Sequence, residues 1–213
     1  MTIAVTIDQV ATLAPNIRPS YRQSFANGQT VFDRFGISQN SLRVAHFMAQ
    51  ILQESGGLAL EYESLNYSPE RLVAVWPSRF KPKGPLDPND YAHNAEKLAN
   101  EVYGNRMGND QPGDGYAFRG RGLIQTTGRD GYTTATTIVR QQFPNAPDFA
   151  AAPDEVLDPA WCLAVAAAEW ADSGCNAKAD QDDLRAVTRA INGGIIGLAA
   201  RAEWLKKTKF VWH

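Results

Sequence analysis

Three carboxylates that lie close together in the chain are the first candidates for chemistry. Glu54 ends an apolar segment, and Glu61 and Glu63 follow beyond the turn Ser55-Gly56-Gly57. Two carboxyl groups that face one cleft are what glycoside hydrolysis requires, since one protonates the leaving oxygen and the other activates a water or attacks the sugar carbon. The chain between Glu54 and Glu63 can span anything up to about 30 Å, so this spacing alone does not choose between retention and inversion.

Other catalytic chemistries find no matching motif in the sequence. The chain contains no Gly-x-Ser-x-Gly elbow, no phosphate loop that ends in Gly-Lys-Ser/Thr, and no His-Glu-x-x-His. Its three histidines, His46, His93 and His213, show no metal-ligand spacing. We therefore expect neither a metal site nor a cofactor, and a structural hydrogen bond is the expected role of His46.

The segment 42–57, LRVAHFMAQILQESGG, must position Glu54, and its pattern predicts a helix. Apolar residues cover a broad face, while Arg43, His46, Gln50 and Glu54 form a polar stripe at helical spacing. This pattern predicts a buried helix with one solvent-facing edge. Glu54 would then lie at the negative end of the helix dipole. This position favours the protonated form of a carboxyl group over the ionised form by roughly 0.3–1 kcal/mol. The simpler alternative is a surface Glu at a helix end.

The remaining segments predict a mainly helical protein. A Ser at the N-cap followed by Pro is typical of a helix start and marks one at Ser68. Six glycines in residues 104–122 predict a long functional loop. We expect one domain over residues 1–213, with the N-terminal helices of residues 6–36 included and at most a small hairpin near 61–67 or 123–127. Further helices are expected at 6–14, 19–35, 90–102, 129–142, 153–172, 182–191 and 198–207, and Ser38 or Ser41 is expected to cap the central one.

Composition and charge describe an ordinary globular chain. The sequence has 213 residues, of which 44% are hydrophobic and 21% charged, with a net charge of −2. This charge gives no reason to expect nucleic-acid binding. No signal peptide and no run of 18 apolar residues is evident, so a cytoplasmic chain without stable membrane insertion is expected. Cys162 and Cys175 are expected to be reduced thiols, and a monomer is the default.

A second cluster of motifs resembles a known family. The segment FRGRGLIQTTGRDGY (118–132) is similar to the cleft segment of glycoside hydrolase family 19, the lysozyme-like chitinases and their phage endolysin relatives. The Glu54-Ser55-Gly56-Gly57 helix end resembles the segment that carries this family's general acid. The turn Asn192-Gly193-Gly194 resembles a third family motif in the same order. The resemblance covers about residues 40–205 and implies a mainly α, two-lobed, lysozyme-like fold with a substrate cleft.

The resemblance also implies roles for individual residues. Glu54 is the general acid of an inverting displacement, and Thr127 stands where the family holds the attacking water. Gln125 and Asn192 are expected to contact the substrate. Glu63 is the expected base, because endolysin-type members have an acidic residue about nine positions after the acid, and Glu61 is the reserve.

Further cleft residues are expected around these. Arg119 and Arg121 either orient the cleft wall or pair with Glu54. Aromatic side chains that could stack on sugar faces are Tyr62, Tyr67, Trp76 and Tyr116. The substrate contacts expected from this group are Tyr67, Tyr116 and Arg121, and Arg201 joins them.

Two substrates fit the resemblance, peptidoglycan and chitin. The absence of a chitin-binding module, a secretion signal and a disulfide set favours a phage-type endolysin, which would stay in the host cytoplasm until a holin opens the membrane. The partner would be peptidoglycan or another glycan containing N-acetylglucosamine, and the bond cleaved is left open. The alternatives among enzymes are a bacterial cell-wall hydrolase, a secreted antibacterial effector and a chitinase. The alternative from a different functional class is a chitinase-like lectin that binds sugar without catalysis.

Overall fold

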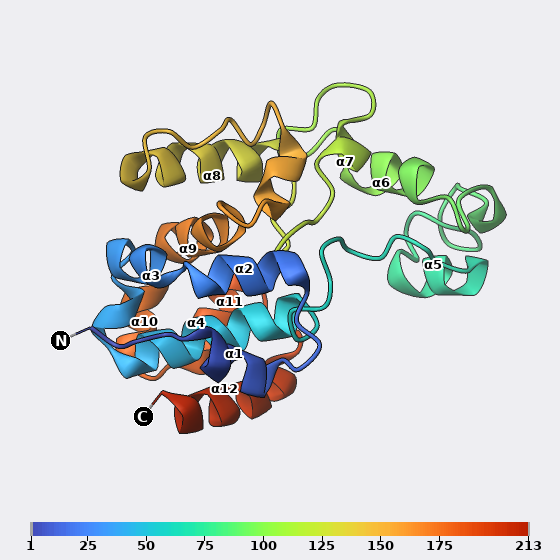
Figure 1. Cartoon of the computed structure of the whole chain (residues 1–213). Coiled ribbons are helices and arrows are strands. Elements are labelled where there is room, and N and C mark those ends of the chain that lie inside the picture. The colour runs from blue at the N-terminus through green and yellow to red at the C-terminus, as the bar shows by residue number, and fades with distance from the viewer. Residues whose placement is uncertain (1, 213) are drawn as a thin grey trace.

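The structure is a computed structural model, and it describes residues 2–212. Helices account for its architecture, and the part of the chain that it describes contains isolated β-bridges instead of strands (Figure 1). The mainly helical prediction is therefore confirmed. The α-helices are α1 (Ile7–Leu13), α2 (Pro19–Ala26), α3 (Gln29–Arg34), α4 (Ser41–Glu54), α5 (Pro69–Val75), α6 (Ala95–Tyr103), α7 (Asp114–Ala117), α8 (Arg129–Gln142), α9 (Cys162–Asp172), α10 (Cys175–Asp180), α11 (Leu184–Asn192) and α12 (Leu198–Val211).

Helix α4 runs through the larger body of the molecule and ends at Glu54, as expected (Figure 1). Asn40 caps its start by accepting a hydrogen bond from the amide of Leu42, so the expectation of a serine cap was wrong. The expected solvent-facing edge was also wrong, because His46 and Gln50 are fully buried. Helix α12 packs along this edge of α4 and closes it off from water.

The buried His46 has a structural partner. Its Nε2 lies 2.8 Å from Oδ1 of Asp182, in the turn before α11. This contact fixes the first half of α4 against the C-terminal helices, as expected for a structural histidine.

Two predicted helices are each broken in the structure. The segment 19–35 forms α2 and α3, separated at Gly28, where a β-carbon would lie only 2.5 Å from Cδ2 of Leu163. The segment 153–172 forms a 3-10 turn, η3 (Pro153–Leu157), and then α9. Asp158 is extended between them, because the following Pro159 disfavours a helical conformation in the residue before it.

A smaller lobe carries its own hydrophobic core. Leu65, Leu72, Phe80, Leu98 and Val102 are buried together, separately from the main core. Helices α5 and α6 of this lobe lie to one side of the larger body (Figure 1). Ser68 caps α5 as expected, whereas Asn94 and not Asp90 caps α6, because residues 88–90 form a separate 3-10 turn. The two-lobed arrangement is thus present.

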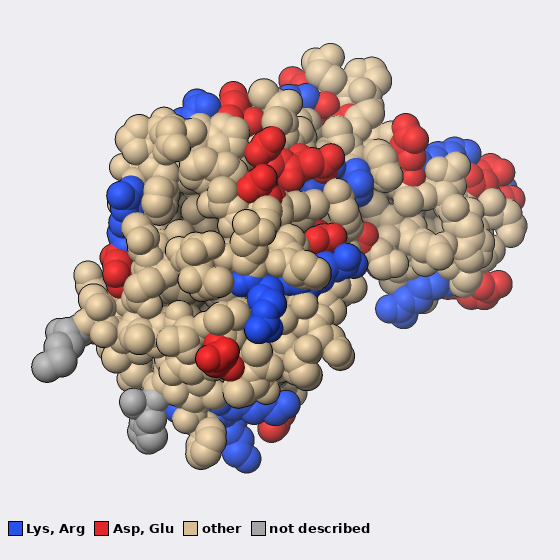
Figure 2. All heavy atoms as spheres, viewed as in Figure 1, with Lys and Arg blue, Asp and Glu red and all other residues tan. Residues whose placement is uncertain are grey.

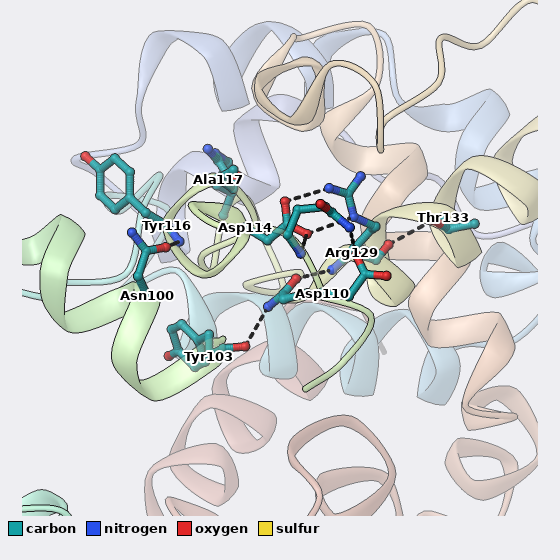
Figure 3. A network of polar contacts seen from close by, with 11 residues as sticks. Asn100, Tyr103, Asp110, Asp114, Tyr116, Ala117, Arg129 and Thr133 are labelled. Carbon is teal, nitrogen blue, oxygen red and sulfur yellow. Dashed lines mark hydrogen bonds and ion pairs between the residues drawn. The ribbon is translucent and has the colours of Figure 1, made fainter. Parts of the chain in front are cut away.

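The glycine-rich segment 104–122 contains the short helix α7 and is held by polar contacts. Asp114 forms an ion pair with Arg129 of α8 across 2.6 Å (Figure 3). Asn109 donates to the carbonyl of Tyr103 and accepts from the amide of Arg129. Burial works to raise the pKa of Asp114, but the ion pair with Arg129 and backbone donors bring it below its ordinary value. The segment is therefore fixed between α6 and α8.

Two further expectations concern the cysteines and membranes. Cys162 and Cys175 are both buried and form no disulfide with each other in the described structure, and their reduced state stays a prediction. Among the helices of residues 2–212, none has the length and apolar character needed to cross a membrane.

Candidate active site

A short backbone arrangement joins the segment after α4 to the segment before α8. Arg121 forms antiparallel bridges with both Tyr62 and Thr126. The amide of Glu63 donates to the carbonyl of Gly120 across 3.0 Å. These bridges take the place of the expected hairpin, and they bring residues 61–63 alongside residues 120–127.

Three of the expected site residues converge on Gly120. A β-carbon at this position would lie 3.2 Å from Oε1 of Glu63, from Oε1 of Gln125 and from Oγ1 of Thr127. The absence of a side chain at Gly120 therefore leaves room for three polar atoms around one point. The structure thus brings together Glu63, Gln125 and Thr127, as the sequence predicted.

Glu63 is held by a hydrogen bond at each carboxylate oxygen. The amide of Gly120 donates to Oε1 across 2.5 Å, and the hydroxyl of Tyr103 donates to Oε2 across 2.6 Å. The two donors hold the carboxyl group of Glu63 in a fixed orientation. Glu63 therefore has the orientation and partners that suit a group that accepts a proton.

Gln125 adopts a backbone conformation that is uncommon for its residue type. Its φ is +60°, in the left-handed region that favours glycine. The carbonyl of Gln125 accepts from Oγ1 of Thr127 across 2.7 Å, and its side chain donates to the carbonyl of Gly122. Such local strain tends to occur where function requires a particular geometry. Here it turns Gln125 and Thr127 toward Gly120.

Glu54 contacts an arginine that the sequence assigned to the substrate. Its Oε1 accepts a hydrogen bond from Nη2 of Arg201 in α12. Nη1 of Arg201 donates to Oε1 of Gln50, one turn earlier in α4, across 2.5 Å. The side chain of Arg201 is only 3% exposed, whereas that of Glu54 is 19% exposed. Arg201 therefore lies behind Glu54, and its geometry corrects the expectation that it contacts substrate.

The arginines of the cleft motif do not pair with Glu54 in the described structure. The guanidinium of Arg119 lies over the rings of Tyr62 and Tyr116. Arg121 is 4% exposed, and its guanidinium contacts Asp154, the hydroxyl of Tyr132 and backbone carbonyls. Arg121 therefore serves the scaffold of the bridges, and its burial corrects its expected role as a substrate contact.

Glu61, the reserve base, points to a different set of partners. Its carboxylate accepts from Oγ of Ser20 across 2.9 Å and lies 3.3 Å from Arg18. These residues belong to the start of α2, away from the Gly120 cluster. The geometry therefore favours Glu63 over Glu61 as the base.

The remaining predicted contacts lie around the site with differing exposure. Tyr67 is half-buried and packs edge-on against Trp76. Tyr116 is half-buried beneath Arg119. Asn192 is exposed at the end of α11, where its side chain donates to the carbonyl of Ile196 across 3.4 Å. The substrate contacts expected of these three residues stay predictions.

One acidic residue of the site was missed by the sequence reasoning. Glu169 of α9 accepts a hydrogen bond from Oγ1 of Thr126 across 3.2 Å. Burial raises its pKa to about 7, the hydrogen bond from Thr126 acts against this, and the negative charge of Glu54 adds to it. The available signal was a single acidic residue within the apolar run LAVAAAEW.

Comparisons with known proteins identify the family of the chain. No family model matches the chain. A protein of Haemophilus influenzae named "Glycosyl hydrolase family 19 domain-containing protein" is 36% identical over 169 residues, which are 77% of this chain and 77% of that protein. The chain belongs to glycoside hydrolase family 19.

Solved family 19 structures share the fold of this family 19 chain. Chitinase C from Streptomyces griseus matches 98% of the chain and 76% of its own length, with a TM-score of 0.60 and 19% identity. A bacterial family 19 chitinase matches 98% of the chain and 94% of its own length, with a TM-score of 0.63 and 18% identity. The protein is thus a glycoside hydrolase with the lysozyme-like chitinase fold.

Charged groups on the viewed face of this hydrolase are mixed in sign. Figure 2 shows acidic side chains gathered over η3, where Asp154, Glu155 and Asp158 line an open groove. Lysines and arginines are scattered among them, and no large basic patch appears on this face (Figure 2).

Proposed function

We propose that the chain is a peptidoglycan-degrading hydrolase of the endolysin type, which cleaves the β-1,4 glycan backbone with inversion. In this proposal Glu54 is the acid, Glu63 is the base and Thr127 holds the attacking water. The observation that carries it is the convergence of Glu63 and Thr127 on the space beside Gly120. An inverting hydrolase needs its base to share such a space with a water.

The hydrogen bonds of Glu63 and Thr127 suit these roles. The hydroxyl proton of Thr127 is directed to the carbonyl of Gln125, so its oxygen lone pairs are left to accept from a water. That water then directs its other hydrogen toward the carboxylate of Glu63, which takes a proton as the oxygen attacks the sugar carbon. Tyr103 and Gly120 keep this carboxylate from rotating.

Glu54 and Arg201 supply the complementary half of the reaction. Protonated Glu54 donates its proton to the glycosidic oxygen as the bond to the sugar carbon breaks. The carboxylate that remains on Glu54 is then stabilised by the guanidinium of Arg201. Gln50 holds that guanidinium in place from the opposite side.

The spacing of the acid and base supports an endolysin within family 19. The base favoured by geometry is Glu63 and not Glu61. Glu63 lies at the position where the endolysin-type members carry an acidic residue. In this proposal the enzyme stays in the host cytoplasm until a holin opens the membrane. Chitin is the second candidate substrate, because the solved structures that share the fold are named chitinases.

Parallel assays on two substrates test the proposal. We expect the protein to clear a suspension of Gram-negative cells with permeabilised outer membranes and to release no sugar from colloidal chitin. Release from chitin without clearing would replace the proposal by a chitinase, and binding without release from either would indicate a lectin. Glu54→Gln is the control, because clearing that survives this substitution cannot come from the proposed acid. Mass spectrometry of the new reducing ends identifies the bond that is cleaved.

A further inference from the structure

Glu169 is a carboxyl group without a cation to balance it. It lies in α9 between buried alanines and the buried Trp170. Among residues 2–212, no Lys, Arg or His forms an ion pair with it, and its hydrogen bond comes from the neutral hydroxyl of Thr126. Glu169 is half-buried, and a carboxylate that is partly withdrawn from water without a counter-charge is costly, so such a group usually holds a proton or has a functional use.

Glu169 shares a cavity with the residue proposed to hold the water. It lines a cavity of about 240 Å³ that Thr126 and Thr127 also line. Thr126 is 2% exposed, and its backbone pairs with Arg121 in both directions. Thr126 is therefore fixed by contacts to Glu169 and Arg121, and it is directly followed in the chain by Thr127.

The charged groups that face Glu169 come from several elements. Asp130 of α8 and Asp172 of α9 line the same cavity, and no lysine or arginine does. Glu54 of α4 acts on Glu169 electrostatically, as does Asp172, and both disfavour its ionised form. The thiol of Cys175 in α10 feels the charge of Glu169 in turn. Arg201 of α12 is paired with Glu54, so it offsets the charge of Glu54 and leaves that of Glu169 uncompensated.

We propose that Glu169 is a positioning residue of the hydrolase: its carboxyl oxygen fixes Thr126, and Thr126 in turn fixes the proposed water-holding residue, Thr127. Oε2 of Glu169 accepts from the hydroxyl of Thr126 across 3.2 Å. A carboxyl group and a carboxamide both offer such an acceptor oxygen, whereas an aliphatic side chain offers none. The role therefore depends on the acceptor at this position and not on its charge.

Rescue by the conservative variant separates this role from a purely structural one. Glu169→Gln keeps an acceptor for Thr126, whereas Glu169→Leu removes it. We expect kcat of Glu169→Gln to stay within about twofold of wild type and kcat of Glu169→Leu to fall by about tenfold, with little change in KM for either variant. The substrate is whichever glycan the wild type cleaves. Glu203→Gln, on the exposed side of α12, is the matched control.

Further variants keep the inference testable if Glu169→Gln folds poorly. Thr126→Val removes the hydroxyl that links Glu169 to the water site, and we expect it to lower kcat by about tenfold with little change in KM. In the Thr126→Val background, Glu169→Leu should lower kcat much less than it does in the wild-type protein. Additive losses, or equal losses of kcat in Glu169→Gln and Glu169→Leu, would overturn the inference.

The inference rests on the proposed function, in which Thr127 holds the water and Glu54 is the acid. Glu54→Gln in the same assay separates the two failures. If Glu54→Gln remains active, the assignment of the acid fails. If Glu54→Gln is inactive and Glu169→Leu matches wild type, the inference about Glu169 fails alone.

Discussion

The hydroxyl of Tyr103 donates a hydrogen bond to Oε2 of Glu63 across 2.6 Å, and so links the last residue of α6 to the proposed base. Burial and the nearby Glu63 carboxylate raise the pKa of Tyr103 well above its ordinary value, so this donor keeps its proton throughout the working range. The contact joins the smaller lobe to the acid–base chemistry.

Tyr103→Phe removes this donor and keeps the ring. A hydrogen bond to a charged group contributes about 1.5–3 kcal/mol, so we expect kcat to fall by at least about tenfold as Glu63 gains rotational freedom. Steady-state kinetics on the cleaved glycan measure this loss. Tyr91→Phe, in the same lobe, is the matched control, since the ring of Tyr91 packs on Phe80. Equal kcat values for Tyr103→Phe and wild type would contradict the orienting role.

Gly120→Ala tests the space that Glu63, Gln125 and Thr127 share. The added methyl group would lie 3.2 Å from an oxygen of each of the three, closer than ordinary van der Waals contact. We expect the protein to fold and kcat to fall by about 10²-fold, because small misplacements of reacting groups cost about this much. Gly131→Ala, in α8, is the control, since its methyl group meets only an ordinary contact, 3.6 Å from Cγ2 of Thr126. Similar kinetics for both variants would argue against a water site at Gly120.

Glu63→Gln and Glu61→Gln form a matched pair. We expect Glu63→Gln to lose activity by about 10²–10⁴-fold, the usual contribution of a positioned acid or base. Glu61→Gln loses a partly exposed ion pair with Arg18, which changes stability by less than about 1 kcal/mol and leaves turnover intact. Thermal unfolding beside the kinetics checks that both variants fold. A loss of less than about tenfold in Glu63→Gln would shift the base elsewhere.

Glu169 also predicts a dependence of stability on pH. The unfolded chain releases this proton near the ordinary value of 4.5, whereas the native protein holds it until about 7. The native state therefore binds more protons between these values, and the free energy of unfolding falls as the pH rises through this window. We expect Glu169→Gln to lack this contribution, so its melting temperature relative to wild type rises from acid to alkaline pH. A constant difference across the window would indicate an ordinary pKa for Glu169.

The sequence predicted the parts of the site that local chemistry determines. The glycine turn placed Glu54 at the end of α4, and the Ser68-Pro69 pair placed the start of α5. The Glu63, Gln125 and Thr127 cluster could be predicted only through the family motif, because it depends on backbone bridges between segments far apart in the chain.

Tertiary packing decided what the sequence did not predict. The polar stripe of α4 reads as solvent-facing, yet Gln50 is buried because α12 supplies Arg201 as its partner. The same packing turned Arg201 from an expected substrate contact into the partner of Glu54. Glu169 was missed because a single acidic residue in an apolar helical segment does not change the pattern that predicts a buried helix. The pattern also does not show which residues lie next to its side chain.

The pairing of Glu54 with Arg201 joins residues 147 positions apart. A ribosome completes α4, the Gly120 segment and α9 before it reaches α12. Until α12 docks, Gln50 and Glu54 lack the guanidinium that holds them, and the polar stripe of α4 is open to water. Biosynthetic order thus makes the contact between Glu54 and Arg201 one of the last parts of the proposed site that the chain can complete.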